Sequence, residues 1–198
     1  MAFITPFEIF DIIMMALAIG FIFSDHFRRP VVHETNDGKY DPLKYYTEKR
    51  SSIWENTKFA AMITAPPLVL HELSHKFIAM YYGATATLHA PYTMYAIAVI
   101  MKLMSFPLLF FVGGYVEHTQ LPALPSAFVS FAGPLMNFLV WFICWALVRY
   151  KFAKRNSYKI IVPMGRISLF LGIFNMIPIP GFDGWNFITS MINVFKGM

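Results

Sequence analysis

His71, Glu72 and His75 form an HExxH pattern, His71-Glu72-Leu73-Ser74-His75, inside a long apolar stretch. On a helix, side chains at positions i and i+4 lie one turn apart on the same face, so both imidazoles can bind one Zn²⁺. Glu72 lies within a turn of both histidines and suits the role of general base. The pattern therefore predicts metal-assisted hydrolysis.

The alternative for these residues is a polar cluster packed between helices without a metal. Each ionisable group at the centre of a membrane-spanning helix costs about 2.5–3.5 kcal/mol, even on the lenient insertion scale. Such residues usually mark a function, and this favours the metal site.

A catalytic zinc site needs a third protein ligand and keeps its fourth position open for water. Asp183 is the candidate, because it is the only acidic residue between Glu117 and the C-terminus. An aspartate before a glycine is also common in turns, which is the alternative for Asp183. If Asp183 ends the apolar run 160–182 and shares a metal with the two histidines, we expect the two helices to run parallel, with an odd number of crossings between them.

The composition predicts an integral membrane protein. Hydrophobic residues make up 57% of the 198 residues and charged residues only 14%, against about 25% in a soluble domain. The net charge of +5 comes from loop lysines and arginines, which suit anionic lipid headgroups. We therefore expect a lipid bilayer around the protein and no nucleic acid as partner. Cys144 is the only cysteine, so an intramolecular disulfide and a cysteine-based metal site are excluded.

The apolar runs predict an all-α polytopic membrane protein of about five to six transmembrane helices. About 20 apolar residues cross a bilayer, and four runs are long enough, whereas the run 185–195 is short for a full crossing. The run 92–116 is interrupted by Lys102, Pro107 and Gly113-Gly114, and we expect it to be a re-entrant or β-hairpin element without a net crossing. The four long runs are 3–23, 59–82, 124–148 and 160–182.

Three segments resemble the site-2 protease family of intramembrane zinc metalloproteases. The first is the HExxH segment, the second is Gly133-Pro134-x-x-Asn137, similar to the family's GPxxN, and the third is Asn175-x-x-Pro178-x₄-Asp183-Gly184, similar to its NxxPxxxxDG. The resemblance covers roughly residues 57–198. We accordingly expect residues 1–56 to form a first transmembrane helix with a hydrophilic loop, and residues 57–198 to form the protease core.

The resemblance implies a zinc endopeptidase that cleaves transmembrane segments of other membrane proteins. It implies that His71, His75 and Asp183 bind Zn²⁺, and that Glu72 acts as base and then as acid. It also implies that Asn175 hydrogen-bonds the substrate carbonyl or the oxyanion.

Asn137, Gly113 and Gly114 are candidate substrate-binding residues. A strand at 110–115 could pair with an unwound substrate through main-chain hydrogen bonds, which tolerate many sequences. The alternatives are a buried strand or helix end for this stretch, and an interhelical hydrogen bond for Asn137.

Pro66-Pro67 leaves two helical carbonyls without donors just before the motif. The pair predicts a kink, which either admits water to the site or has a structural role alone.

Other functions stay open at this point. One is a catalytically silent protein that binds membrane proteins or acts in their quality control, although such a protein has no use for the Glu72 carboxylate. Another is a zinc transporter, for which more acidic residues within the membrane would be expected.

The expected location is the cell membrane of a prokaryote. By the positive-inside rule the basic loops would be cytoplasmic, which places His75 and Asp183 toward the outer half of the membrane. The resemblance implies the reverse, a site that opens toward the cytoplasm. Orientation, substrate identity and oligomeric state stay open.

Overall fold

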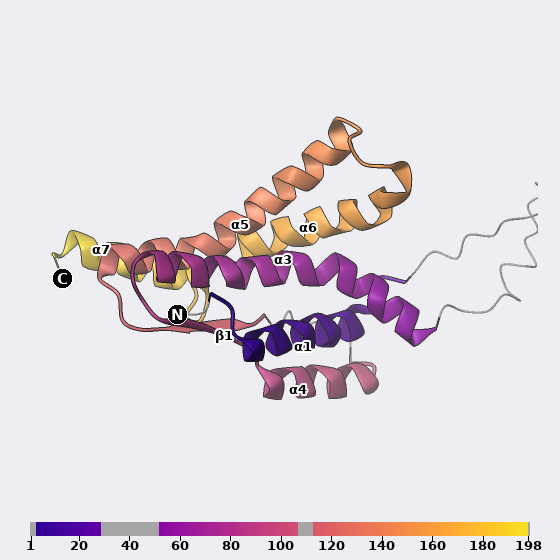
Figure 1. The fold of residues 1–198 in the computed structure, drawn as a ribbon, viewed down its shortest axis with the longest axis horizontal. Coiled ribbons are helices and arrows are strands. Elements are labelled where there is room, and N and C mark those ends of the chain that lie inside the picture. Colours follow the sequence, from indigo (N-terminus) through magenta and orange to yellow (C-terminus); the bar gives the residue numbers. More distant parts are fainter. Residues whose placement is uncertain (1–2, 29–51, 107–112, 198) are drawn as a thin grey trace, which may run out of the picture.

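The protein is a helical bundle with one small sheet, described in a computed structural model over residues 3–28, 52–106 and 113–197. This architecture agrees with the predicted helical class (Figure 1). The described elements are α1 (Pro6–Phe23), α3 (Ile53–Tyr81), β1 (Ala86–His89), α4 (Tyr92–Leu103), β2 (Tyr115–His118), α5 (Ala123–Arg149), the 3₁₀ turn η1 (Arg155–Ser157), α6 (Tyr158–Asn175) and α7 (Asp183–Phe195).

Helix α3 lies in the middle of the molecule and carries the HExxH segment. Helix α1 packs on one side of it, with α4 on the outer side of α1, and α5 and α6 pack on the other (Figure 1). Helices α3 and α6 run in the same direction, and α5, which lies between them in the sequence, runs in the opposite direction, as expected for two motif segments separated by one crossing (Figure 1).

Three helices are long and apolar enough to cross a membrane, namely α1, α5 and the stretch Arg155–Asn175 that contains α6. These helices fit a membrane protein. Helix α3 has 29 residues, but buried ionisable groups, including Glu72 and Lys76, interrupt its apolar sequence. Helix α4 has 12 residues, about 18 Å, which is short of a bilayer core of about 30 Å. The total of five to six crossings stays a prediction.

The segment between α3 and α5 returns to its starting point. Strands β1 and β2 pair antiparallel, with Ala86 opposite His118 and His89 opposite Tyr115, so the chain enters and leaves this segment at the same end of the bundle. The predicted strand at 110–115 falls partly on residues 110–112, outside the described residues, and β2 begins at Tyr115. Strand β1 was not predicted, although its residues Ala86-Thr87-Leu88-His89 alternate apolar and polar, because four residues are the shortest length at which such alternation indicates a strand.

The helix predicted over 160–182 is shorter than expected. Helix α6 ends at Asn175, since Pro178 and Pro180 cannot continue a helical hydrogen-bond ladder, and Gly181 turns the chain with φ +98°. Asp183 therefore begins α7 instead of ending α6.

The proline pair lies inside a helix that continues through it. Pro66 and Pro67 are both part of α3, and Pro67 is fully buried by neighbouring helices. The predicted water entry at this place stays a prediction.

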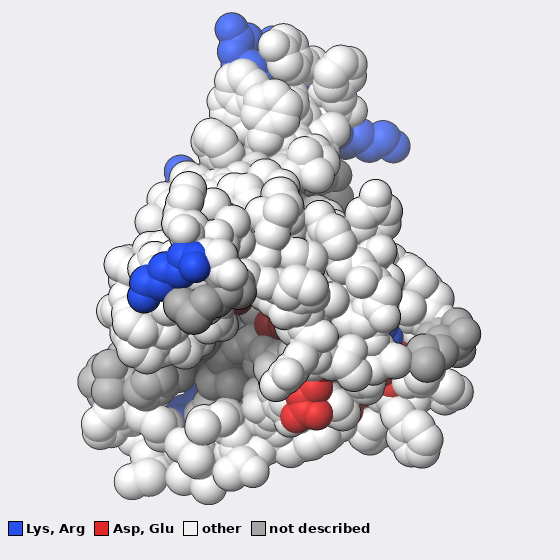
Figure 2. Space-filling view, turned by 90° about the vertical axis from the view of Figure 1, so that its left-hand side faces the viewer, with Lys and Arg blue, Asp and Glu red and all other residues white. Residues whose placement is uncertain are grey.

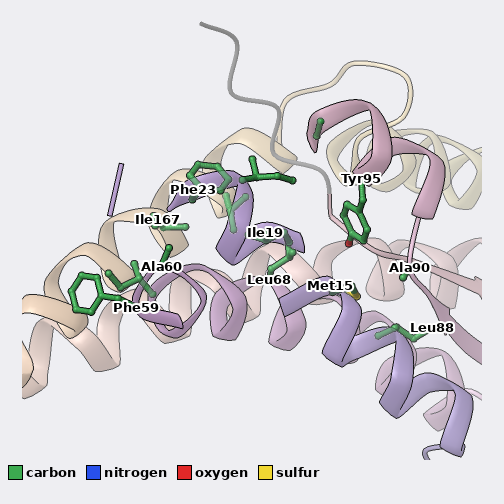
Figure 3. Close-up of a cluster of buried hydrophobic side chains, with 14 residues drawn as sticks. Met15, Ile19, Phe23, Phe59, Ala60, Leu68, Leu88, Ala90, Tyr95 and Ile167 are labelled. Atoms are coloured by element: carbon green, nitrogen blue, oxygen red, sulfur yellow. The ribbon is translucent and has the colours of Figure 1, made fainter. Parts of the chain in front are cut away.

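An apolar core joins α1 to α3 and reaches α4 and α6. Figure 3 shows Met15, Ile19 and Phe23 of α1 facing the same cluster as Leu68 of α3 and Tyr95 of α4. Nearby, an added Cβ at Gly20 would come within 2.6 Å of the Ala61 Cβ, so the two helices pack at backbone contact distance.

A buried ion pair links the N-terminus of α1 to the helix that bears the motif. Glu8 Oε1 accepts hydrogen bonds from Lys76 Nζ and from the backbone N–H of Leu88 in β1, the latter at 2.9 Å. Glu8 also closes a capping box with Thr5. Glu8 and Lys76 are 2% and 3% exposed, so each charge depends on its partner.

We expect Lys76→Met to lower the free energy of unfolding by about 3–5 kcal/mol, because it leaves the Glu8 carboxylate buried without its counter-charge. Denaturation in detergent micelles measures the change. Lys159→Met, at an exposed position of α6, is the matched control and should shift the unfolding transition little. Equal stability of the two variants would contradict a structural role for the ion pair.

Candidate metal centre

Three ligand atoms from two distant segments converge in the interior. His71 Nε2 lies 3.1 Å from His75 Nε2, and Asp183 Oδ2 lies 3.0 Å from the first and 3.4 Å from the second. These three residues form the metal-binding group found among the described residues. Tetrahedral ligands at about 2.0–2.1 Å from Zn²⁺ are themselves about 3.3–3.4 Å apart, so the triangle fits a zinc site after small adjustments.

Asp183 reaches the histidines because α7 begins directly against the end of α6. An added Cβ on Gly184 would lie 2.9 Å from the Met176 Cα and closer still to the Met176 carbonyl. Only glycine allows this approach, which explains why a glycine follows the candidate ligand.

The histidines are oriented by hydrogen bonds on their other ring nitrogens. His75 Nδ1 donates to the Val129 carbonyl at 2.7 Å, which leaves Nε2 free to bind a metal. The Asn137 amide lies 2.9 Å from His71 Nδ1, and rotating the amide by 180° presents its oxygen to an Nδ1–H. Ser168 Oγ donates to the Asn137 backbone carbonyl at 2.8 Å. Such outer partners fix the ring orientation of metal-binding histidines.

Gly133 and Pro134 shape the wall of α5 that faces the histidines. An added Cβ on Gly133 would lie 2.6 Å from His71 Nε2, and nearer to His75 Nε2, so glycine alone leaves room for both rings. Pro134 lies inside α5 and cannot donate to the Ser130 carbonyl. The carbonyl that holds His75 belongs to this same perturbed turn.

A cavity of about 380 Å³ opens beside the three ligands. Glu72 lines it and is buried, and the backbone of Gly114 hydrogen-bonds its carboxylate. Gly113, Gly114 and residues of β2 line the cavity, and so do Asn175 and Asp183. The end of the molecule seen in Figure 2 is hollowed.

The structure brings most of the predicted site residues together. His71, Glu72, His75, Asn175 and Asp183 line the cavity, as do Gly113 and Gly114. Asn137 lies elsewhere: it is completely buried behind His71, not on the cavity wall. Its position matches the interhelical hydrogen bond that we kept as the alternative, since it joins α5 to α3.

The sequence analysis did not identify four residues that support the site: Gly133, Gly184, Ser168 and Glu8. The spacing of the motifs pointed to Gly133 and Gly184, but not to their contacts. Ser168 carries no local signal, because its partner Asn137 lies 31 positions away along the chain. Thr5-x-x-Glu8 is a local helix-capping pattern, but the bond from Lys76 to Glu8 spans 68 positions and has no such signal.

The chain is similar to two proteins of Methanocaldococcus jannaschii. The first bears the name "Putative zinc metalloprotease MJ0611" and is 33% identical over 134 residues, which cover 64% of this chain and 70% of that protein. The chain belongs to this zinc metalloprotease family. The second, named "Zinc metalloprotease MJ0392", is 25% identical over 145 residues, or 72% of this chain, and the match spans only 38% of its length. These relatives support a zinc-dependent peptidase.

Neither the models of known families nor the solved structures gave a match to the chain.

We expect Gly133→Ala to lower bound zinc at least 10-fold, because the added methyl group occupies the space of the two imidazoles. Elemental analysis of the purified protein measures the zinc. Gly165→Ala is the matched control, since its Cβ would lie 2.8 Å from the Cys144 Cβ and meets neither the histidines nor Asn137. Full zinc occupancy in Gly133→Ala would contradict the proposed fit.

We expect Asn137→Leu to weaken zinc binding by about 10–100-fold, the usual effect of removing a partner of a metal-binding histidine. A competition titration with a chelating dye measures the affinity. Ser126→Ala, on the same helix and bonded to the Leu121 carbonyl, serves as control. Unchanged affinity in Asn137→Leu would mean that the amide holds the helices together and nothing more.

Proposed function

We propose that the protein is an intramembrane zinc endopeptidase of the site-2 protease type, which cleaves transmembrane segments of other membrane proteins. The observation that carries the proposal is the triangle of His71, His75 and Asp183 beside the Glu72 carboxylate. This triangle lies within a bundle whose outer surface is largely apolar.

His71, His75 and Asp183 would hold the zinc ion. Two neutral imidazoles and one carboxylate are a known catalytic ligand set, which leaves a fourth position for water. When bound, the ion polarises a carbonyl and lowers the pKa of its water from about 15.7 to about 7. The orienting bonds to Val129 and Asn137 keep both Nε2 atoms aimed at the same point.

Glu72 would move the proton. Its carboxylate accepts the proton of the attacking water and returns it to the amide nitrogen that leaves, so the group ends each cycle as it began. The hydrogen bond from the Gly114 backbone holds the carboxylate toward the cavity. Gly113 keeps that approach open, because a Cβ there would lie 3.0 Å from Glu72 Oε1.

Asn175 would bind the carbonyl of the bond that is cut. It lines the cavity at the end of α6, eight positions before Asp183, and an amide N–H there can donate to developing negative charge on that oxygen.

Strand β2 and the two glycines before it would hold the unwound substrate. Tyr115 and Val116 belong to β2, and they line the cavity together with Gly113 and Gly114. An extended peptide along this wall could pair through main-chain hydrogen bonds, which select for unwinding more than for sequence.

The surroundings favour a substrate within the bilayer. Large apolar side chains are exposed along the outer faces of the helices, among them Phe7 at 84% and Phe142 at 53%. A water-soluble protein rarely exposes so much apolar surface. We place the protein in a prokaryotic cell membrane and leave its orientation open.

We expect Glu72→Gln to keep its zinc and to lose cleavage by about 10²–10⁴-fold, the usual contribution of a general base. The assay follows cleavage of a transmembrane reporter in liposomes, with zinc measured on the same sample. Glu55→Gln, in the first turn of α3 and remote from the cavity, is the matched control.

Two outcomes would contradict the proposal. Equal cleavage by wild type and Glu72→Gln would remove the catalytic role of Glu72. Wild-type protein that binds zinc and the reporter, yet cleaves no transmembrane segment offered, would support the silent binding protein.

A further inference from the structure

A second cavity, of about 290 Å³, lies between α5 and α6 at the end remote from the metal centre. The two helices diverge toward the loop that joins them (Figure 1). They meet where an added Cβ on Gly165 would lie 2.8 Å from the Cys144 Cβ, and this contact forms the floor of the cleft. Arg166, the cavity residue nearest Asn175 in sequence, is nine positions, about 14 Å, from it along α6.

The cleft combines apolar walls with two guanidinium groups. Trp145, Val148 and Val162 line it from both helices, and so do Arg149 and Arg166. Arg149 is the last residue of α5, whereas Arg166 lies eight positions inside α6. Tryptophan and arginine are typical of the level where hydrocarbon meets headgroups.

Neither arginine has an ion pair among the described residues. The chain contains no acidic residue between Glu117 and Asp183, so neighbouring sequence cannot supply one. Within that stretch lie six basic residues: Arg149, Lys151, Lys154, Arg155, Lys159 and Arg166. An arginine charge at the edge of the hydrocarbon still needs a polar or anionic partner, and this favours an anion from the surroundings.

The direction of α6 tilts Arg166 toward the end of the cleft where Arg149 lies. Side chains on a helix lean toward its N-terminus, and the N-terminus of α6 lies at the loop end of the cleft. Arg166 therefore leans toward the level of Arg149. A guanidinium group offers paired N–H donors that match the oxygens of a phosphate.

We propose that the α5–α6 cleft binds one anionic phospholipid, with its phosphate on Arg149 and Arg166 and an acyl chain in the cavity. The charge of the cleft selects this occupant over a zwitterionic lipid or a neutral helix. Because α6 leads into the short loop that ends at Asp183, the first residue of α7, the lipid braces the helix on which the metal centre depends. The site is independent of the proposed peptidase activity.

The test uses the full chain in a neutral detergent and follows lipid binding by native mass spectrometry and thermal unfolding. The probes are phosphatidylglycerol, phosphatidylcholine with the same acyl chains, and inorganic phosphate. We expect one phosphatidylglycerol per chain and a rise in the unfolding temperature, with at least 10-fold weaker binding of phosphatidylcholine.

The variant Arg149→Gln/Arg166→Gln should weaken phosphatidylglycerol binding at least 10-fold. The matched control, Lys151→Gln/Lys154→Gln, removes the same charge from the loop outside the cavity and should keep the binding. Val162→Trp fills the cavity without altering charge and should also abolish phosphatidylglycerol binding. It tests the proposal if the arginine variant fails to fold.

Three results would overturn the proposal. An equal loss of phosphatidylglycerol binding in the lysine control would mean that the lipid is attracted by diffuse charge. Equal binding of phosphatidylglycerol and phosphatidylcholine would mean that the cleft is apolar and does not select the headgroup. A shift with inorganic phosphate as large as with phosphatidylglycerol would mean a free-anion site.

Discussion

Asp183 Oδ2 lies within 3.4 Å of both motif imidazoles, and much of the structure serves to allow this approach. The two histidines come from one turn of α3, so their proximity is local. Asp183 lies 108 or more positions further along the chain, so only tertiary packing can bring it to the histidines. For Asp183 to reach the histidines, α6 must run parallel to α3 and end at Asn175. The chain must then turn before α7 begins.

Small residues make this convergence possible. Gly133 leaves space for the imidazoles on the wall of α5, and Gly184 lets the first turn of α7 rest on the end of α6. Tightly packed interiors have no spare volume for a methyl group. The glycines in the GPxxN-like and DG-like segments therefore have a steric cause, separate from any chemistry of their own.

Polar groups inside the bundle are satisfied by one another. Asn137 joins His71 to Ser168, and Glu8 joins Lys76 to the backbone of β1. The second network joins α1 to the helix that carries the HExxH segment. The sequence did not indicate this link, because α1 lies outside the segments that resemble the family. The same network also ties the sheet to the helix that bears the HExxH segment.

Local patterns in the sequence were enough to predict zinc-dependent hydrolysis and a helical bundle. The HExxH spacing depends only on the period of a helix, and the apolar runs depend only on hydropathy. Both can therefore be recognised from neighbouring residues in the sequence. The tertiary structure was needed to show that β1 pairs with β2, that Asn137 lies behind His71 instead of on the cavity wall, and that Glu8 supports the core. These features depend on contacts between residues far apart in the chain, where steric fit and buried charge, and not local pattern, select the partner.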